Sequence, residues 1–319
     1  MMNFVVADRT VFVNSIKLQS WISNGFLSHE NEESALQEFF DNHFAVKAKP
    51  FVKWVGGKRQ LLKQFHDLYP QDFDPVNNKY FEPFVGGGAV FFDLQPCKAT
   101  LSDWNQELVT TYLMIRDNVE ELIEDLKKQK YEKEFFLKVR AKDPKKLSSL
   151  KVASRFIYLN RTCFNGMYRV NKSGGFNVPF GRYTNPKICD EVNLRNVSRL
   201  LQNVDIAHRS YTEVLDHAKA GDFVYFDPPY YPVSKTSSFT SYNSDAFLEK
   251  EQIELRDVFF ELHKRGCYVM LSNSDTPFIQ KIYSELKPEI KIKKVQAGRN
   301  INSKASGRGK VSELVILNY

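Results

Sequence analysis

Cysteine and histidine are scarce in this chain, and neither is spaced for a metal centre. The four cysteines among 319 residues are scattered and include no CxxC pair. The six histidines include no HExxH pattern and no close pair. This arrangement predicts neither a disulfide framework nor a zinc site, and it identifies no metal ligands.

Long apolar runs are also missing. No segment approaches the roughly 18 consecutive apolar residues of a membrane-spanning helix. The first residues, MMNFVVADRT, lack the basic region and the apolar stretch of a secretory signal peptide. Together with the scattered cysteines, these features predict a cytoplasmic protein.

Acidic residues are absent from three basic stretches of the chain, whose net charge is +7. Residues 47–63, 155–187 and 291–310 contain six, six and seven Lys and Arg, respectively, and no acid. Seven aromatic residues lie within the middle stretch. Since solvated faces usually mix both signs, this clustering favours a phosphate-rich partner such as nucleic acid.

From about residue 51 the sequence alternates between strand and helix patterns. Strands are predicted at 79–84, 99–103, 204–208, 222–226, 267–273, 290–296 and 311–318, and helices at 89–94, 105–130, 212–218 and 245–265. A basic, aromatic segment rich in Asn and Gly interrupts this rhythm at 131–203. We therefore predict an α/β fold, a doubly wound Rossmann-like sheet with an inserted helical and hairpin module. The first 50 residues carry no motif, and an acidic helix is expected at 30–38.

A glycine turn follows the first strand of the α/β pattern. In FEPFVGGGAVFFDL the strand ends at Gly86, Gly87 and Gly88, whose backbone a ligand can approach closely. Asp103 ends the next strand, where an acid binds a ribose hydroxyl in nucleotide-binding sheets. The spacing does not distinguish a dinucleotide from another adenosine cofactor. Asp103 could instead cap the helix that begins in NQELV.

A second glycine turn lies in KWVGGKRQLL, between Trp54 and Lys58. It is not a P-loop, because the GxxxxGK[ST] pattern is absent. Taken alone, these residues also suit an ordinary exposed turn that opens a basic helix.

An acid, two prolines and two tyrosines follow the buried strand in GDFVYFDPPYYP. The prolines stop the strand and stiffen the backbone, so the Asp227 carboxylate and the Pro228 carbonyl form a rigid pair of acceptors. Such a pair can grip both hydrogens of an NH₂ group, and the Tyr230 ring offers a face on which a base stacks. These residues suit an enzyme that alkylates the amino group of a nucleobase.

Seven segments, in order, resemble the Dam-like DNA adenine-N6 methyltransferases, both the solitary enzymes and those of GATC restriction-modification systems. They are KWVGGK, FEPFVGGG, SDWN, NRTCFNGMYRVN, FNVPFGRY, FDPPY and SFTSY, and the resemblance runs from about Phe51 to Tyr319. It implies site-specific methyl transfer from S-adenosylmethionine to the N6 amino group of adenine in double-stranded DNA. The target base would be flipped out of the duplex. GATC is the site that the resemblance suggests.

The same resemblance implies a role for each matching residue. Asp227 would lie between cofactor and amine, Pro228 would supply the carbonyl acceptor, and Tyr230 would stack on the flipped adenine. The cofactor would be bound by Trp54, Lys58, Gly86, Gly87, Gly88, Asp103 and Asp227. The predicted parts are an N-terminal extension of unknown role (1–50), a catalytic domain in two pieces (51–130 and 204–319) and a target-recognition insert (131–203).

DNA contacts are predicted mainly in the insert. YRVNKSGGF looks like a hairpin around Ser173-Gly174-Gly175, from which nearby polar side chains can reach base edges in the major groove. Val170 stands where the solitary enzymes have an aromatic residue. Some of the basic residues could contact phosphate alone, without reading a base. The full predicted set is Arg161, Asn165, Arg169, Asn171, Lys172, Arg182, Arg299 and Arg308.

Two other functions stay open from the sequence. One is methylation of RNA adenine or of cytosine N4, and the other is a catalytically silent DNA-binding protein of the same fold. The basic, aromatic insert favours duplex DNA, and the intact DPPY segment and Asp103 favour activity. A cognate restriction endonuclease would share only the DNA sequence with this protein and would not contact it.

Overall fold

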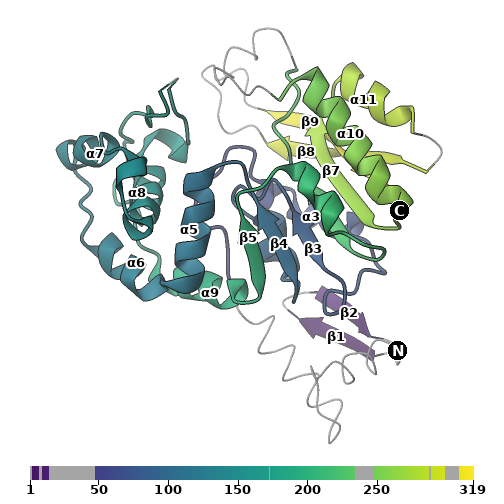
Figure 1. The fold of residues 1–319 in the computed structure, drawn as a ribbon, viewed down its shortest axis with the longest axis horizontal. Helices are drawn as coiled ribbons and strands as arrows, with labels where there is room; N and C mark the ends of the chain where they lie inside the picture. Colours follow the sequence, from purple (N-terminus) through teal and green to yellow (C-terminus); the bar gives the residue numbers. More distant parts are fainter. Residues whose placement is uncertain are drawn as a thin grey trace, which may run out of the picture.

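The computed structural model describes most of the chain, and Figure 1 shows its fold. The described residues are 2–6, 9–13, 47–171, 173–233, 247–286, 289–298 and 309–319. Near the N-terminus, β1 (Met2–Val6) pairs antiparallel with β2 (Arg9–Val13), a hairpin that no sequence motif predicted. The helix expected at 30–38 lies outside the described residues.

A mixed sheet of seven strands forms the centre of the described fold, in the order β5-β4-β3-β6-β7-β9-β8. The strands are β3 (Tyr80–Glu82), β4 (Ala99–Ser102), β5 (Val204–Ala207), β6 (Phe223–Phe226), β7 (Tyr268–Ser274), β8 (Lys291–Gly298) and β9 (Lys310–Leu317). The strands from β5 to β7 are parallel, whereas β9 runs antiparallel to β7 and β8. Because the chain order reverses between β3 and β6, the sheet has its switch point there.

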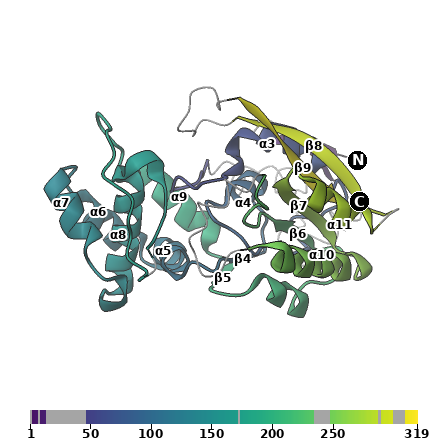
Figure 2. The same cartoon turned by 90° about the horizontal axis from the view of Figure 1, so that it is seen from above.

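Helices cover both faces of this sheet (Figure 2) because its central strands are apolar on both sides. In β6, Phe223 and Tyr225 belong to one core, whereas Val224 and Phe226 belong to the other. The first core includes residues of α3 (Leu62–Phe65), α4 (Ala89–Leu94) and α5 (Gln106–Asp117), and the second includes residues of α10 (Glu249–Lys264) and α11 (Pro277–Ser284). The predicted α/β, Rossmann-like class is therefore confirmed.

Four more helices lie on the β5 side of the sheet (Figure 1). They are α6 (Val119–Lys127), α7 (Lys133–Arg140), α8 (Ser149–Thr162) and α9 (Glu191–Leu201). Phe136, Tyr158 and Phe176 form part of a separate core cluster, whereas Phe156 and Leu194 join the core of the sheet. The segment 131–203 thus has a core cluster of its own and also contributes residues to the core of the sheet.

Three helices differ from the sequence expectation. The helix expected at 105–130 is broken into α5 and α6 at Asn118, whose φ of −141° and ψ of 47° are not helical. The helix expected at 212–218 is a 3₁₀ segment, η5 (Tyr211–Asp216), and α10 begins at Glu249. The other 3₁₀ segments are η1 (Lys58–Gln60), η2 (His66–Leu68), η3 (Pro144–Lys146) and η4 (Phe164–Gly166).

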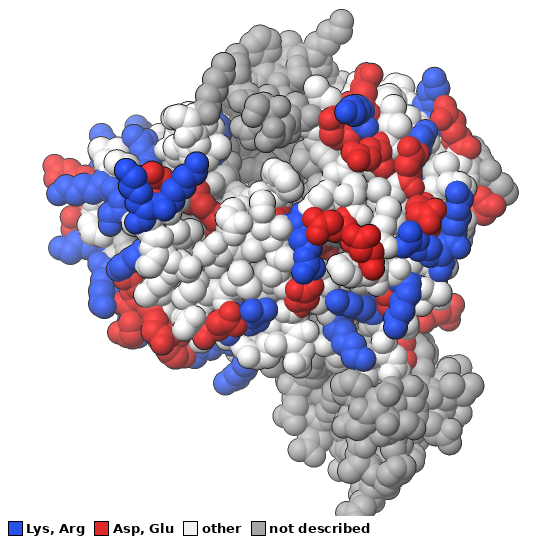
Figure 3. Space-filling view, in the orientation of Figure 1, with Lys and Arg blue, Asp and Glu red and all other residues white. Residues whose placement is uncertain are grey.

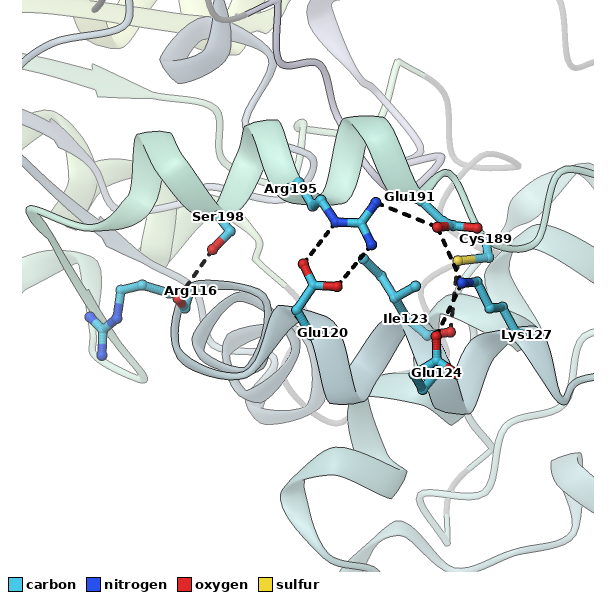
Figure 4. Close-up of polar contacts among 9 residues, drawn as sticks. All are labelled: Arg116, Glu120, Ile123, Glu124, Lys127, Cys189, Glu191, Arg195 and Ser198. Atoms are coloured by element: carbon cyan, nitrogen blue, oxygen red, sulfur yellow. Dashed lines mark hydrogen bonds and ion pairs between the residues drawn. The ribbon is translucent and has the colours of Figure 1, made fainter.

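Polar contacts join α9 to α5 and α6 (Figure 4). The Arg195 guanidinium donates to both Glu120 oxygens at 2.7 and 2.8 Å, and the Lys127 ammonium lies 3.2 Å from Glu191. Ser198 donates to the Arg116 carbonyl at 3.3 Å. Because the charged pairs are largely exposed, they contribute little stability, and the apolar face of α9 does most of the anchoring.

Candidate active site

A cavity of about 1220 Å³ is lined by residues that follow the carboxyl ends of β3, β4 and β6, at the switch point of the sheet. The residues predicted for cofactor and catalysis that line it are Trp54, Lys58, Gly86, Gly87, Gly88, Asp103, Asp227, Pro228 and Tyr230. These residues come from four separate segments of the chain, at 54–58, 86–88, 103 and 227–230. The structure therefore brings together every one of them.

The glycine turn requires glycine for two reasons. Gly86 and Gly88 have φ of 47° and 67°, in the left-handed region that side chains other than glycine disfavour. A Cβ atom on Gly86 would also lie 2.6 Å from the Trp54 ring, and one on Gly88 would lie 2.8 Å from the Tyr112 hydroxyl. The turn therefore keeps its backbone at the cavity wall with Trp54 packed against it.

Asp103 ties the glycine turn to the end of β4. One of its oxygens accepts a hydrogen bond from the Gly86 amide at 3.0 Å, and the other accepts from the Asn105 amide at 2.9 Å. Burial raises the pKa of Asp103, and these amide bonds oppose that rise. The alternative that Asp103 caps the next helix is wrong, because the Asn105 side chain caps α5 through the Leu108 amide.

Trp54 and Lys58 are fixed from the side of the KWVGGK turn. The Trp54 ring stacks on Phe156 and Tyr168, with centroid distances of 6.3 and 6.0 Å. Lys58 is only 3% exposed, and its Nζ lies 2.8 Å from an Asp227 oxygen. The Gly56-Gly57 turn itself is exposed, as the alternative interpretation expected, but Lys58 is buried and the helix that follows begins as the single 3₁₀ turn η1.

The DPPY segment presents a carboxylate, a carbonyl and a ring to the cavity. The Asp227 side chain is 21% exposed, and burial raises its pKa while Lys58 opposes the rise. Pro228 is buried, and within the described part of the chain no donor reaches its carbonyl. The Lys58 ammonium also lies 4.8 Å from the centroid of the Tyr230 ring, whose hydroxyl donates to Glu313 at 2.8 Å.

A buried amide pair behind this segment was missed by sequence reasoning. Gln252 on α10 donates to the Pro229 carbonyl at 3.0 Å, and Asn273 on β7 donates to Gln252 at 2.9 Å. The Asn273 oxygen accepts from the Tyr231 amide at 3.2 Å, and both amide side chains are fully buried. The available signal was the polar end, SNS, of an otherwise apolar strand. This pair holds the backbone of the DPPY segment in place.

Glu82 is a second residue that sequence reasoning did not single out. It ends β3, lines the cavity and is buried. Its Oε2 accepts from the Tyr80 hydroxyl at 2.8 Å and from the Phe91 amide at 3.1 Å. Burial raises the pKa of Glu82 to about 8, so the carboxyl is protonated at neutral pH. An acid at the end of a buried strand was the signal in the sequence.

The predicted DNA-contacting residues divide between the cavity and the hairpin. Arg161 lines the cavity, where its guanidinium donates to the Phe51 carbonyl at 2.6 Å. Asn165 also lines the cavity and is exposed, with a left-handed φ of 55°. Arg182 is exposed next to the hairpin segment.

The predicted hairpin is present, with Val170 bridged to Phe176. The Asn171 oxygen accepts from the Ser173 amide, the Ser173 hydroxyl and the Gly175 amide at 2.8–3.1 Å. Asn171 thus shapes the turn, leaving only its NH₂ group for a base. Arg169 is exposed and donates to Asn177 at 2.7 Å. Lys172, Arg299 and Arg308 lie outside the described residues.

The described part of the chain contains neither a cluster of metal-binding side chains nor a membrane-spanning helix. Among these residues, no group of three or more His, Cys, Asp or Glu side chains could hold a metal ion. None of the described helices is both long and apolar enough to cross a membrane. Lys and Arg side chains gather at the α7–α8 end of the face in Figure 3, where an anionic partner would be attracted.

Comparisons with known proteins agree with this site. The family model described as D12 class N6 adenine-specific DNA methyltransferase matches residues 54–301. Type II methyltransferase M1.LlaDCHI of Lactococcus lactis subsp. cremoris is 43% identical over 282 residues, which cover 86% of this chain and 96% of that protein. Type II methyltransferase M.MjaIII of Methanocaldococcus jannaschii is 45% identical over 293 residues, 86% of this chain and 100% of that protein. The DNA adenine methylase of Escherichia coli strain K12 is 32% identical over 275 residues, 85% of this chain and 95% of that protein.

Proposed function

Because this chain belongs to the D12 class of N6 adenine-specific DNA methyltransferases, we propose that it methylates the adenine of GATC in double-stranded DNA, with S-adenosylmethionine as methyl donor. The observation that carries this proposal is the grouping of Asp227, Pro228 and Tyr230 in the same cavity as the glycine turn. Since the proposed substrate is DNA, we place the protein in the cytoplasm, associated with the nucleoid in a prokaryotic or viral setting.

The cavity residues fit S-adenosylmethionine. A volume of about 1220 Å³ exceeds what a ligand of this size needs. Each Asp103 oxygen holds one backbone amide, and a carboxylate has about four acceptor positions, so two are left for ribose hydroxyls. The residues that would hold the cofactor are Trp54, Lys58, Gly86, Gly87, Gly88 and Asp103. When bound, the cofactor supplies a methyl group on a sulfonium, which is a good leaving group.

The DPPY residues would then position the amine. The Asp227 carboxylate and the Pro228 carbonyl accept the two N–H groups of adenine N6, which frees the nitrogen lone pair from conjugation with the ring. Tyr230 stacks on the extruded base, a contact worth roughly 1–3 kcal/mol. The buried Gln252–Asn273 pair fixes this turn, so the reaction is accelerated mainly by alignment.

Lys58 and Asp227 are paired in the structure, and the target amine competes for the same oxygens. Asp227 has a second oxygen and Lys58 also donates to the Gly56 carbonyl, so the ammonium can keep one acceptor when the amine binds. Lys58 opposes the rise that burial causes in the pKa of Asp227, and so favours the carboxylate, which is the form that accepts from an amine.

Recognition of GATC rests on the insert 131–203. The similarity of NRTCFNGMYRVN and FNVPFGRY to GATC-methylating enzymes supports this site, and Arg169 is of a type that donates to guanine O6 and N7. The exposed hairpin around Ser173-Gly174-Gly175 supports a role in the major groove. Val170 and the Ser173-Gly174-Gly175 turn are the places where the specificity would depart from that of the solitary enzymes.

The test is expression in a host that lacks adenine methylation, followed by single-molecule sequencing of its DNA. We expect methylated adenine in GATC and resistance to an endonuclease that GATC methylation blocks. Methylated adenine in another sequence would reject GATC and keep the enzyme class. Labelled methyl transfer to RNA in preference to duplex DNA would reject the DNA substrate.

A further inference from the structure

We propose that Glu313 is a positioning residue for methyl transfer, which acts by holding the Tyr230 ring in the plane on which the target adenine stacks. This inference rests on the stacking role proposed above for Tyr230. It concerns a residue 83 positions further along the chain, on a different strand.

Glu313 reaches the site because of the antiparallel arrangement of β9. In β9 it lies opposite Ser274 at the end of β7 and opposite Val295 of β8. Its side chain is half-buried, and its Oε2 accepts the Tyr230 hydroxyl proton at 2.8 Å. The strand that closes the sheet therefore supplies a carboxylate to the segment that follows β6.

The two ends of the Tyr230 side chain are held from different elements. The backbone of Pro229, next to it, is fixed by Gln252, and the hydroxyl is fixed by Glu313. Without the second anchor the ring would be free to turn about its χ angles, because terminal ring torsions are broad. A stacked base follows the plane of the ring beneath it, so a loose ring would misplace the amine relative to the methyl donor.

The chemistry of the acceptor adds to this geometry. A hydrogen bond from a phenol to a carboxylate is shorter and stronger than one between neutral groups. It also makes the ring more electron-rich, and such a face attracts positive charge, as the nearby Lys58 ammonium at 4.8 Å illustrates. The adenine amine becomes positive as it takes the methyl group, so the same face favours the transition state.

The structure offers a matched control. The neighbouring Tyr231 hydroxyl donates to Glu249 at 2.8 Å, but this pair is exposed and Glu249 does not line the cavity. A Glu249→Met substitution removes the same kind of bond one residue away. We expect it to leave the transfer rate unchanged.

The experiment is a double-mutant cycle of Glu313→Met and Tyr230→Phe, with Glu313→Gln as the conservative variant. Single-turnover methylation is measured on a duplex that contains the site mapped for the wild-type enzyme, and base flipping is followed by 2-aminopurine fluorescence at the target position. We expect each single substitution to slow transfer about tenfold, the value of one hydrogen bond to a charged group. The double variant should be no slower than either single one, Glu313→Gln should recover part of the rate because it keeps a neutral acceptor, and cofactor affinity should not change.

Several results would overturn the proposal. A wild-type transfer rate in Tyr230→Phe would overturn it, even if Glu313→Met did not fold. A loss near a hundredfold in the double variant would mean that Glu313 acts independently of the Tyr230 hydroxyl. Failure of the wild-type enzyme to methylate duplex DNA would instead reject the proposed function, so the two failures are distinguishable.

Discussion

Asp227→Ala should abolish methyl transfer while the protein stays folded. The substitution removes the carboxylate that is proposed to hold the target amine, and a hydrogen bond to a charged group is worth about 1.5–3 kcal/mol, or roughly 10- to 150-fold in rate. Loss of alignment adds about 100-fold, because a misplacement of about 1 Å has that effect. We therefore expect a reduction of about 10³-fold or more.

The same substitution should have a limited effect on stability. Asp227→Ala leaves the Lys58 ammonium, only 3% exposed, without its counter-ion. Breaking a fully buried pair costs about 3–5 kcal/mol, but Asp227 is 21% exposed and Lys58 keeps the Gly56 carbonyl as an acceptor. We expect a loss of about 1–3 kcal/mol in the free energy of unfolding. Much of it should be recovered in the double variant Lys58→Met/Asp227→Ala, because no buried charge is then left.

Two measurements check this reasoning. Transfer of a labelled methyl group to DNA is measured for folded, DNA-binding Asp227→Ala protein, and urea denaturation gives the stability of the single and double variants. A single variant that keeps more than about a tenth of the wild-type rate would refute the assigned role, since that loss is smaller than the effect of even one hydrogen bond to a charged group. A double variant less stable than Asp227→Ala would refute the account of Lys58.

Three further changes have defined outcomes. Tyr230→Ala should lower kcat/KM more than Tyr230→Phe or Tyr230→Trp, because base stacking is worth about 1–3 kcal/mol, and equal losses would point to the hydroxyl alone. Arg169→Ala should relax the choice of one base pair if this side chain reads a base; a uniform loss with a shallower salt dependence would assign it to phosphate. Glu82→Gln should flatten the pH dependence of stability. Because the folded state keeps a proton on Glu82 up to about pH 8, this carboxyl adds to the free energy of unfolding at low pH. Its contribution is full below about pH 4.5 and is lost as the pH rises through 8. The urea midpoints of the wild-type protein and of Glu82→Gln are measured at pH 5 and pH 8.5. An equal change of midpoint with pH in both proteins would contradict this prediction.

The convergence of the glycine turn, Asp103 and Asp227 at one cavity was predictable from the sequence. Gly86–Gly88, Asp103 and Asp227 each follow a short apolar strand, and the carboxyl ends of parallel strands meet at one edge of a sheet. Two proline residues after Asp227 fix the local backbone wherever the segment lies. Such features are local, so they can be read without knowing which distant segment packs beside them.

Helix boundaries and side-chain partners were less accessible. The periodic pattern of 105–130 is continuous, yet Asn118 breaks it so that α6 can pack beside α9. Asn171 suits a base edge by type, but its oxygen is used by the turn it belongs to. In both cases a residue allowed two local arrangements, and packing selected one of them.

The sequence by itself determined the class of fold, the glycine turn at 86–88 and the rigid backbone at Asp227 and Pro228, because these depend on strand patterns and on residues adjacent in the chain. Only the tertiary structure decided what surrounds them. Glu313 contacts Tyr230 because β9 enters the sheet antiparallel beside β7, and Gln252 supports Pro229 because α10 covers that face. Such contacts join residues 23 and 83 positions apart, and their pairing is set by sheet order and helix packing, which no local pattern encodes.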